Sequence, residues 1–144
     1  MKIAIGCDHV GYELKKRVID HLTEKGHEVV DFGTDSTERT DYPIYGEKAA
    51  NAVASGECDR GIVICGTGIG ISITANKIKG IRAALCSDCY SAEATRLHND
   101  ANVLALGGRV IGIELAKKIV DTFLDTEFSG GERHVRRISM MEEE

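Results

Sequence analysis

Short apolar runs alternate along this chain with segments whose apolar residues recur at helical spacing. The run at residues 2–7 is followed by residues 12–25, in which Leu14, Val18 and Leu22 repeat every four positions. This spacing is typical of an amphipathic helix with one buried face. Gly26 then predicts the end of that helix. The same alternation continues toward the C-terminus, so strands and helices are expected to follow one another singly.

The apolar runs predict five strands, and the segments between them predict helices. Strands are expected at residues 2–7, 27–32, 61–65, 81–86 and 102–106, and helices at 12–25, 44–55, 71–78, 91–98, 111–124 and 132–141. The polar segment 34–43 lacks periodicity and is expected to be a loop. Strands joined by single helices imply a parallel sheet with right-handed crossovers. We therefore expect one domain over residues 1–144, of the α/β class: a doubly wound, three-layer α/β/α Rossmann-like sandwich around a five-stranded parallel sheet.

Composition excludes several classes of protein. The 144 residues are 42% hydrophobic and 28% charged, as in an ordinary globular domain. A net charge of −5 argues against general binding to nucleic acid or to membrane surfaces. No apolar stretch approaches the ~18 residues that span a bilayer, and the N-terminus lacks a signal-peptide pattern. The five scattered cysteines suit a reducing compartment, so a cytoplasmic protein is expected.

Polar and reactive residues gather where the expected strands end. Ligands of open parallel sheets bind beyond the carboxyl ends of the strands. The segments expected at this edge are 7–9, 33–34, 65–70, 86–90 and 106–109. Three of these five carry polar or reactive groups beyond what turn formation requires. The functional site is therefore expected at this edge.

A glycine-rich loop, Cys65-Gly-Thr-Gly-Ile-Gly-Ile-Ser72, separates an expected buried strand from a helix. Its glycines allow several N–H groups to converge on one point, where the helix N-terminus adds partial positive charge. The sequence does not fit a P-loop, a dinucleotide fingerprint or a Cys-x5-Arg phosphatase loop, because the residues after Gly70 and the glycine spacing are wrong for each. What remains is an anion-binding hole with a thiol at its edge. A helix N-terminus favours the thiolate, so Cys65 is a candidate base or nucleophile, and a buried core cysteine is the alternative.

Other candidates flank this loop or lie further along the chain. Asp8 and His9 follow the first expected strand, although Asp8 could equally cap a helix. His98 closes a helix before the fifth strand, where it could shuttle protons or only interact with the helix dipole. Arg133 and Arg137 share one face of the last helix and could clamp a phosphate or form a solvated surface.

The pair Cys86-Ser-Asp-Cys89 is a lone C-x-x-C motif. No second pair of ligands lies at zinc-binding spacing, and a redox motif would usually follow an earlier strand. These thiols are expected to have no function, and no metal site is expected.

Taken together, the motifs resemble the type B ribose-5-phosphate isomerases, also called the ribose/galactose isomerase family. The resemblance rests on Lys-Ile-Ala-Ile-Gly-Cys-Asp-His-Val-Gly at 2–11, Glu-Arg-Thr-Asp-Tyr-Pro at 38–43, the glycine loop at 65–72 with Ala-Asn-Lys at 75–77, His-Asn-Asp at 98–100 and Gly-Gly-Arg at 107–109. The motifs follow in order over nearly the whole chain.

The resemblance implies interconversion of D-ribose 5-phosphate and D-ribulose 5-phosphate through an enediolate, without metal or organic cofactor. It implies that Cys65 is the base, that Thr67 and the amides of the loop glycines hold the enediolate oxygens, and that His98 opens the furanose ring. The residues expected to bind substrate are Asp8, His9, Tyr42, Gly66, Gly68, Gly70, Asn99, Arg109, Arg133 and Arg137. The phosphate would lie on His9, Arg133 and Arg137, with Arg136 and His134 as open alternatives.

The resemblance also implies a homodimer, or a tetramer in some members, whose active sites are built from two subunits. Two other functions remain open at this point. One is an isomerase, or an isomerase subunit, for a six-carbon sugar phosphate such as allose 6-phosphate or galactose 6-phosphate. The other is a phosphate- or nucleotide-binding module without turnover, which fold alone does not exclude.

Overall fold

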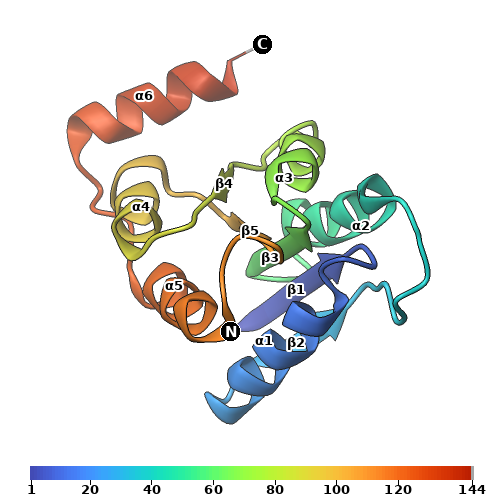
Figure 1. The fold of residues 1–144 in the computed structure, drawn as a ribbon. Coiled ribbons are helices and arrows are strands. Elements are labelled where there is room, and N and C mark those ends of the chain that lie inside the picture. The colour runs from blue at the N-terminus through green and yellow to red at the C-terminus, as the bar shows by residue number, and fades with distance from the viewer. Residues whose placement is uncertain (144) are drawn as a thin grey trace.

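Five parallel strands form the centre of the structure, a computed structural model that describes residues 1–143 (Figure 1). The strands are β1 (Lys2–Cys7), β2 (Glu28–Asp31), β3 (Arg60–Cys65), β4 (Ala83–Leu85) and β5 (Val103–Gly107), in the spatial order β2-β1-β3-β5-β4. The predicted fold class is confirmed. Residue 144, the last of the predicted domain, lies outside the described residues.

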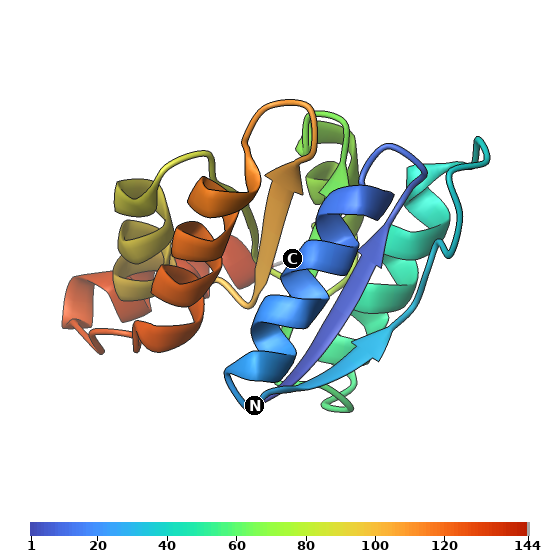
Figure 2. The same ribbon diagram turned by 60° about the horizontal axis from the view of Figure 1, so that its bottom comes forward.

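Helices cover both faces of this sheet (Figure 2). They are α1 (Tyr12–Glu24), α2 (Tyr42–Ala54), α3 (Ile69–Ala75), α4 (Cys89–Ala94), the π-helix η1 (Thr95–Asn99), α5 (Ile113–Asp125) and α6 (Glu132–Glu142). Buried residues of α1 and α5, such as Val18 and Phe123, pack on one face of the sheet, whereas α2 and α3 pack on the other. The second layer is rich in alanine, which lets α2 lie close to the strands.

The connections after β1 and β3 leave toward opposite faces, because α1 belongs to the first layer and α3 to the second. These two strands are neighbours in the sheet. In doubly wound sheets such a divergence opens a crevice at the carboxyl ends of the two strands. The topology therefore places the residues after Cys7 and after Cys65 on two sides of one crevice.

Several predicted boundaries were wrong. Helix α2 begins at Tyr42 rather than 44, because Pro43 is accepted in the first helical turn. Helix α3 begins at Ile69, so Gly70 is helical rather than part of the loop. β4 has three residues instead of the predicted six. The single helix expected at 91–98 begins two residues earlier, because the Asp88 side chain caps α4 by accepting from Ser91 N–H, and it continues beyond Ala94 as the π-helix η1.

A buried lysine ties the first helix to the loop after β2. Lys15 is 1% exposed, and its Nζ donates to Asp31 Oδ1 at 2.8 Å and to the carbonyl oxygen of Thr34. Asp31 is 42% exposed, but removing it is costly because it leaves the buried Lys15 ammonium without a compensating charge. This contact therefore holds the start of the loop that leads to α2.

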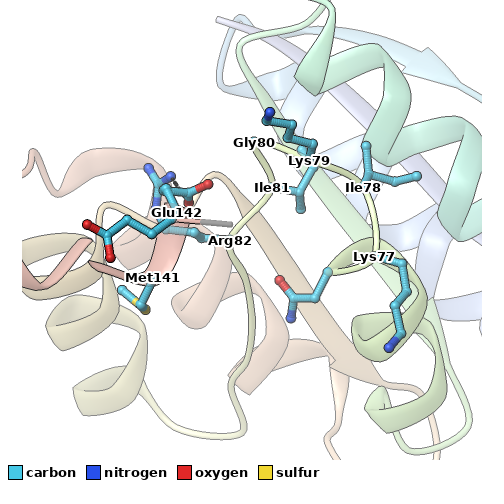
Figure 3. Close-up of a pocket in the computed structure, with 10 residues that line it drawn as sticks. Lys77, Ile78, Lys79, Gly80, Ile81, Arg82, Met141 and Glu142 are labelled. Carbon is cyan, nitrogen blue, oxygen red and sulfur yellow. Dashed lines mark hydrogen bonds and ion pairs between the residues drawn. The ribbon is translucent and has the colours of Figure 1, made fainter. Parts of the chain in front are cut away.

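Helix α6 lies outside the two helical layers (Figure 1). At its C-terminal end Arg82 Nη1 lies 2.8 Å from Glu142 Oε1, and Ser129 before the helix donates from Oγ to Leu97 O at 2.7 Å. A hollow of about 340 Å³ lies between the end of α6 and the segment before β4. Arg82 and Glu142 line it on one side, and Lys77 lines it on the other (Figure 3). No helix within residues 1–143 combines the length and apolar composition required to cross a membrane.

Burial raises the pKa of the Cys7 thiol from its ordinary value of 9.0 to about 12. The native thiol thus keeps its proton where the unfolded thiol has lost it, so stability is present below pH 9 and is lost as the pH rises toward 12. We expect the free energy of unfolding to fall by up to about 1.4 kcal/mol per pH unit in this window through Cys7 alone.

Urea unfolding at intervals between pH 8 and 11 measures this slope, which should be shallower in Cys7→Ala than in the wild type. Val63→Ala removes volume from the core without removing a titrating group and should keep the wild-type slope. Equal slopes in Cys7→Ala and the wild type would contradict the prediction.

Candidate active site

The glycine loop after β3 packs tightly against the end of β5. Gly108 N–H donates to Cys65 O at 2.8 Å, and Arg109 N–H donates to Gly66 O at 2.9 Å. Gly68 has φ +81°, a left-handed conformation that favours glycine, and a Cβ there would lie 2.9 Å from the carbonyl carbon of Leu106. The loop therefore requires glycine both for its turn and for its close approach to β5.

Cys65 lies at the end of β3 with 5% of its surface exposed. Its Sγ accepts a hydrogen bond from Gly68 N–H at 3.2 Å. A donor of this kind stabilises negative charge on sulfur, as the thiolate form requires. Cys86 is also buried, but burial raises its pKa to about 11, and its thiol therefore stays protonated at neutral pH.

A hollow of about 530 Å³ opens beside this thiol. It is lined by seven of the predicted site residues: Asp8, Tyr42, Cys65, Gly66, Thr67, Gly70 and Arg109. Asp8 Oδ1 accepts from the N–H groups of Val10 and Gly11, which fixes the turn before α1, and Asp8 also lines the hollow. Its contact with the sugar stays a prediction. The crevice between β1 and β3 thus collects polar groups from four segments of the chain.

Tyr42 forms one wall of the hollow and lies directly on Gly70. A Cβ at Gly70 would collide with the Tyr42 ring, including its hydroxyl oxygen, 2.6 Å away. Gly70 is therefore needed for the position of the tyrosine rather than for backbone freedom, because it adopts a helical conformation in α3.

His9 follows Asp8 and is oriented by the loop between β2 and α2. Thr40 N–H donates to His9 Nδ1 at 3.2 Å. Because Nδ1 accepts, a neutral His9 carries its proton on Nε2, and that N–H can donate to an anion. The Thr40 hydroxyl in turn lies 2.9 Å from the Tyr45 hydroxyl, which fixes this part of the loop.

The predicted site residues of η1 and α6 lie at the amino edge of the sheet, opposite the carboxyl edge that carries Cys65. Asn99 O accepts from Arg82 Nε at 2.8 Å, and Arg82 directly precedes β4, so the end of η1 lies at the amino edge. His98, the neighbour of Asn99, stacks on His134 of α6, with ring centroids 4.5 Å apart. Figure 2 shows α6 toward the end of the molecule opposite the strand arrowheads. One chain therefore does not bring His98, Asn99 or the arginines of α6 together with Cys65.

Comparison with known proteins identifies the family. A family model described as Ribose/Galactose Isomerase matches residues 3–141. The chain belongs to this family. It is 61% identical over 137 residues to the ribose-5-phosphate isomerase B of Escherichia coli K12, covering 95% of this chain and 91% of that protein.

Two further relatives show a similar likeness. The structure of ribose-5-phosphate isomerase B from Clostridium thermocellum superposes with a TM-score of 0.97 at 60% identity, covering 99% of this chain and 95% of that chain. The galactose-6-phosphate isomerase subunit LacB of Clostridium acetobutylicum is 50% identical over 128 residues, covering 89% of this chain and 74% of that protein.

Two features of this family member were not predicted from the sequence. One is the π turn that carries His98 and Asn99, and the other is the stack of His134 on His98. The periodicity of residues 91–98 gives no signal for a π turn, and a contact between residues 36 positions apart has no local signature. Within residues 1–143 no group of three or more His, Cys, Asp or Glu side chains is arranged to hold a metal ion. All five cysteines are free thiols.

The contact between Tyr42 and Gly70 generates a prediction about stability. Gly70→Ala should lower the free energy of unfolding by about 1–3 kcal/mol, because the added methyl overpacks against the ring. In a Tyr42→Ala background the same change should become neutral or stabilising by up to about 1 kcal/mol, because alanine is the better helix former.

Urea unfolding of the wild type, both single variants and the double variant gives the coupling energy directly. Additive effects of the two substitutions would show that the tyrosine does not rest on Gly70 in solution.

Proposed function

We propose that this chain is an aldose–ketose isomerase that interconverts D-ribose 5-phosphate and D-ribulose 5-phosphate in the non-oxidative pentose phosphate pathway. The observation that carries the proposal is the hollow beside Cys65, where a thiol with an N–H donor on its sulfur faces a glycine loop and a carboxylate. The membership in a family that includes ribose-5-phosphate isomerases supports the same reaction.

In this proposal Cys65 is the base that moves the proton between C2 and C1 of the open-chain sugar. The thiolate takes the proton from C2 of the aldose, which leaves an enediolate, and the thiol returns the proton to C1 to give the ketose. Thr67 and the loop amides stabilise the enediolate oxygens, a preorganised electrostatic contribution of the kind that dominates many enzymes. Asp8 and Tyr42 contact the sugar from the walls of the hollow.

The substrate phosphate is assigned to His9, Arg133 and Arg137. The proton on His9 Nε2 gives one donor at the carboxyl edge, and two guanidinium groups on α6 can form charge-assisted bonds to a dianion. Arg109, which also lines the hollow, neutralises further charge there. The phosphate supplies binding energy that holds C1 and C2 against the base.

We further propose that the active unit is a homodimer in which each site takes residues from both chains. Cys65 and His98 lie at opposite edges of one chain, so a second copy must supply His98, Asn99 and the α6 arginines. Large apolar side chains are exposed around the hollow and on α6, as a subunit interface would require. They include Ile69, Ile73, Leu85, Val110, Val135 and Met140. The five free thiols are consistent with a cytoplasmic protein.

A six-carbon sugar phosphate is the second candidate substrate. The 50% identity to a galactose-6-phosphate isomerase subunit favours it, because the family accommodates both sugar lengths. The 61% identity to a ribose-5-phosphate isomerase B makes the pentose phosphate the first choice.

The Cys65→Ala variant tests the proposed chemistry. We expect the wild type to equilibrate ribose 5-phosphate with ribulose 5-phosphate. In the variant kcat should fall by about 10²–10⁴-fold, the usual contribution of a positioned base. Binding of the sugar phosphate, measured by calorimetry, should persist in the variant because the phosphate ligands are unchanged.

The same wild-type preparation is assayed with allose 6-phosphate and galactose 6-phosphate. Faster turnover of either one would assign the protein to the six-carbon alternative. Binding without turnover of any of the three sugars would instead identify a non-catalytic binding module.

Subunit mixing tests whether the sites are shared. Cys65→Ala and His98→Ala are each expected to be nearly inactive. Unfolded together in equal amounts and refolded, they should recover roughly a quarter of the wild-type activity, because half of the dimers are mixed and each mixed dimer has one complete site of two. No recovery in a mixture shown by mass spectrometry to contain mixed dimers would place Cys65 and His98 in one chain's site.

A further inference from the structure

His134 lies against the face of His98 in the described structure. The ring centroids are 4.5 Å apart and the ring planes differ by 14°, so the two imidazoles are stacked. His98 is otherwise exposed, and it lies at the end of the π turn η1. The stack therefore covers one face of an otherwise exposed ring and leaves the ring's other face open.

His134 itself is held firmly. It is 9% exposed, the one buried residue of α6. The backbone N–H of His134 donates to Gly131 O at 3.0 Å. A Cβ added on Gly131 would lie 3.1 Å from His134 Cδ2, so the ring lies close to the Gly131 backbone. The segment before it is fixed to η1 by the bond from Ser129 Oγ to Leu97 O at 2.7 Å. His134 is therefore the buried partner of the stack and His98 the exposed one.

The surroundings of His134 favour its neutral form. Burial lowers the pKa of His134, and the positive charges of Arg133, a protonated His98 and Arg137 lower it further. Two stacked imidazolium rings would also repel each other. Both effects favour the uncharged form of His134, which then offers His98 a stacking surface without charge.

We propose that His134 is a positioning residue for the ring-opening step: its stacked ring holds His98 in the orientation in which it exchanges a proton with the furanose ring oxygen. This inference rests on the proposed function, in which His98 opens the sugar ring. It assigns His134 a role distinct from that of a phosphate ligand, the alternative left open by the sequence.

In the step itself, the bond between C1 and the ring oxygen breaks. The ring oxygen takes a proton from protonated His98, and the C1 hydroxyl gives its proton to a solvent water, which leaves a C1 aldehyde. A histidine that rotates freely would seldom point its N–H at the ring oxygen, and misplacement by about 1 Å can cost about 10²-fold in rate.

The test exploits a difference between the two sugars. Ribulose 5-phosphate has no furanose form, because the hydroxyl that would close the ring carries the phosphate. Exchange of its C1 hydrogen with deuterated solvent therefore needs Cys65 but no ring opening. Conversion of ribose 5-phosphate needs both steps, so comparing the two rates isolates ring opening.

Two variants separate stacking from the chemistry of the ring nitrogens. His134→Gln removes the aromatic ring, whereas His134→Phe keeps a stacking surface without nitrogen. We expect His134→Gln to lower kcat for ribose 5-phosphate by about 10–100-fold, up to the cost of misplacing a reacting group by about 1 Å. Its exchange at C1 of ribulose 5-phosphate, followed by proton NMR, should stay within about twofold of the wild type, and His134→Phe should keep both rates within the same range.

Several outcomes would overturn the inference. Equal losses in His134→Phe and His134→Gln would show that a ring nitrogen acts directly, and a raised KM for both sugars would identify a phosphate ligand. Loss of C1 exchange in parallel with turnover would show a general structural role. If His134→Gln does not fold by circular dichroism, His134→Leu takes its place, and His27→Ala, in the loop before β2, is the control with unchanged rates. Absence of both turnover and exchange in the wild type would instead overturn the proposed function.

Discussion

The carboxyl edge of the sheet depends on one close approach, between the backbone of the loop after β3 and the backbone after β5. Two hydrogen bonds join these segments, and neither Gly68 nor Gly107 has room for a side chain, since a Cβ on Gly107 would lie 2.6 Å from Thr67 O. Buried backbone groups must be paired, so the two loops cannot separate without losing both bonds. The same contact directs Gly68 N–H at the Cys65 sulfur and sets Arg109 beside Gly66. The geometry of the thiol is therefore a consequence of backbone packing.

The division of the proposed site follows from the topology of a parallel sheet. Each strand ends at the carboxyl edge, and each following helix returns the chain to the amino edge. Asp8, Cys65 and Arg109 lie at or just after the ends of strands, whereas His98 and Asn99 lie at the end of a returning helix. A five-residue strand such as β5 spans about 16 Å, which exceeds the length of a pentose phosphate. Within this fold, the two groups can meet on one substrate only if they come from different chains.

The sequence predicted the sheet because its apolar runs are short, strong and separated by clear helical periodicity. It also predicted the group around Cys65, because residues that directly follow strands must lie at one edge. The same rule puts His98, at the end of a helix before the fifth strand, at the opposite edge from Cys65, a separation that the resemblance alone did not show. The start of α2 at Tyr42 was missed because a polar segment was interpreted as a loop although Pro43 suits a first turn. The stack of His134 on His98 depends on how α6 packs, and no local pattern encodes that.

Helix α6 links association to catalysis in the proposed enzyme. An isolated helix of its length is marginal in water, so its position depends on packing. Its own chain supplies the imidazole stack and the ion pair of Arg82 with Glu142, while Val135, Met140 and Met141 remain exposed. A partner that covers these apolar residues would order the helix that also carries Arg133 and Arg137. A sugar phosphate bound across both chains must then strengthen their association by the same factor by which association strengthens its binding, because the two equilibria are thermodynamically linked.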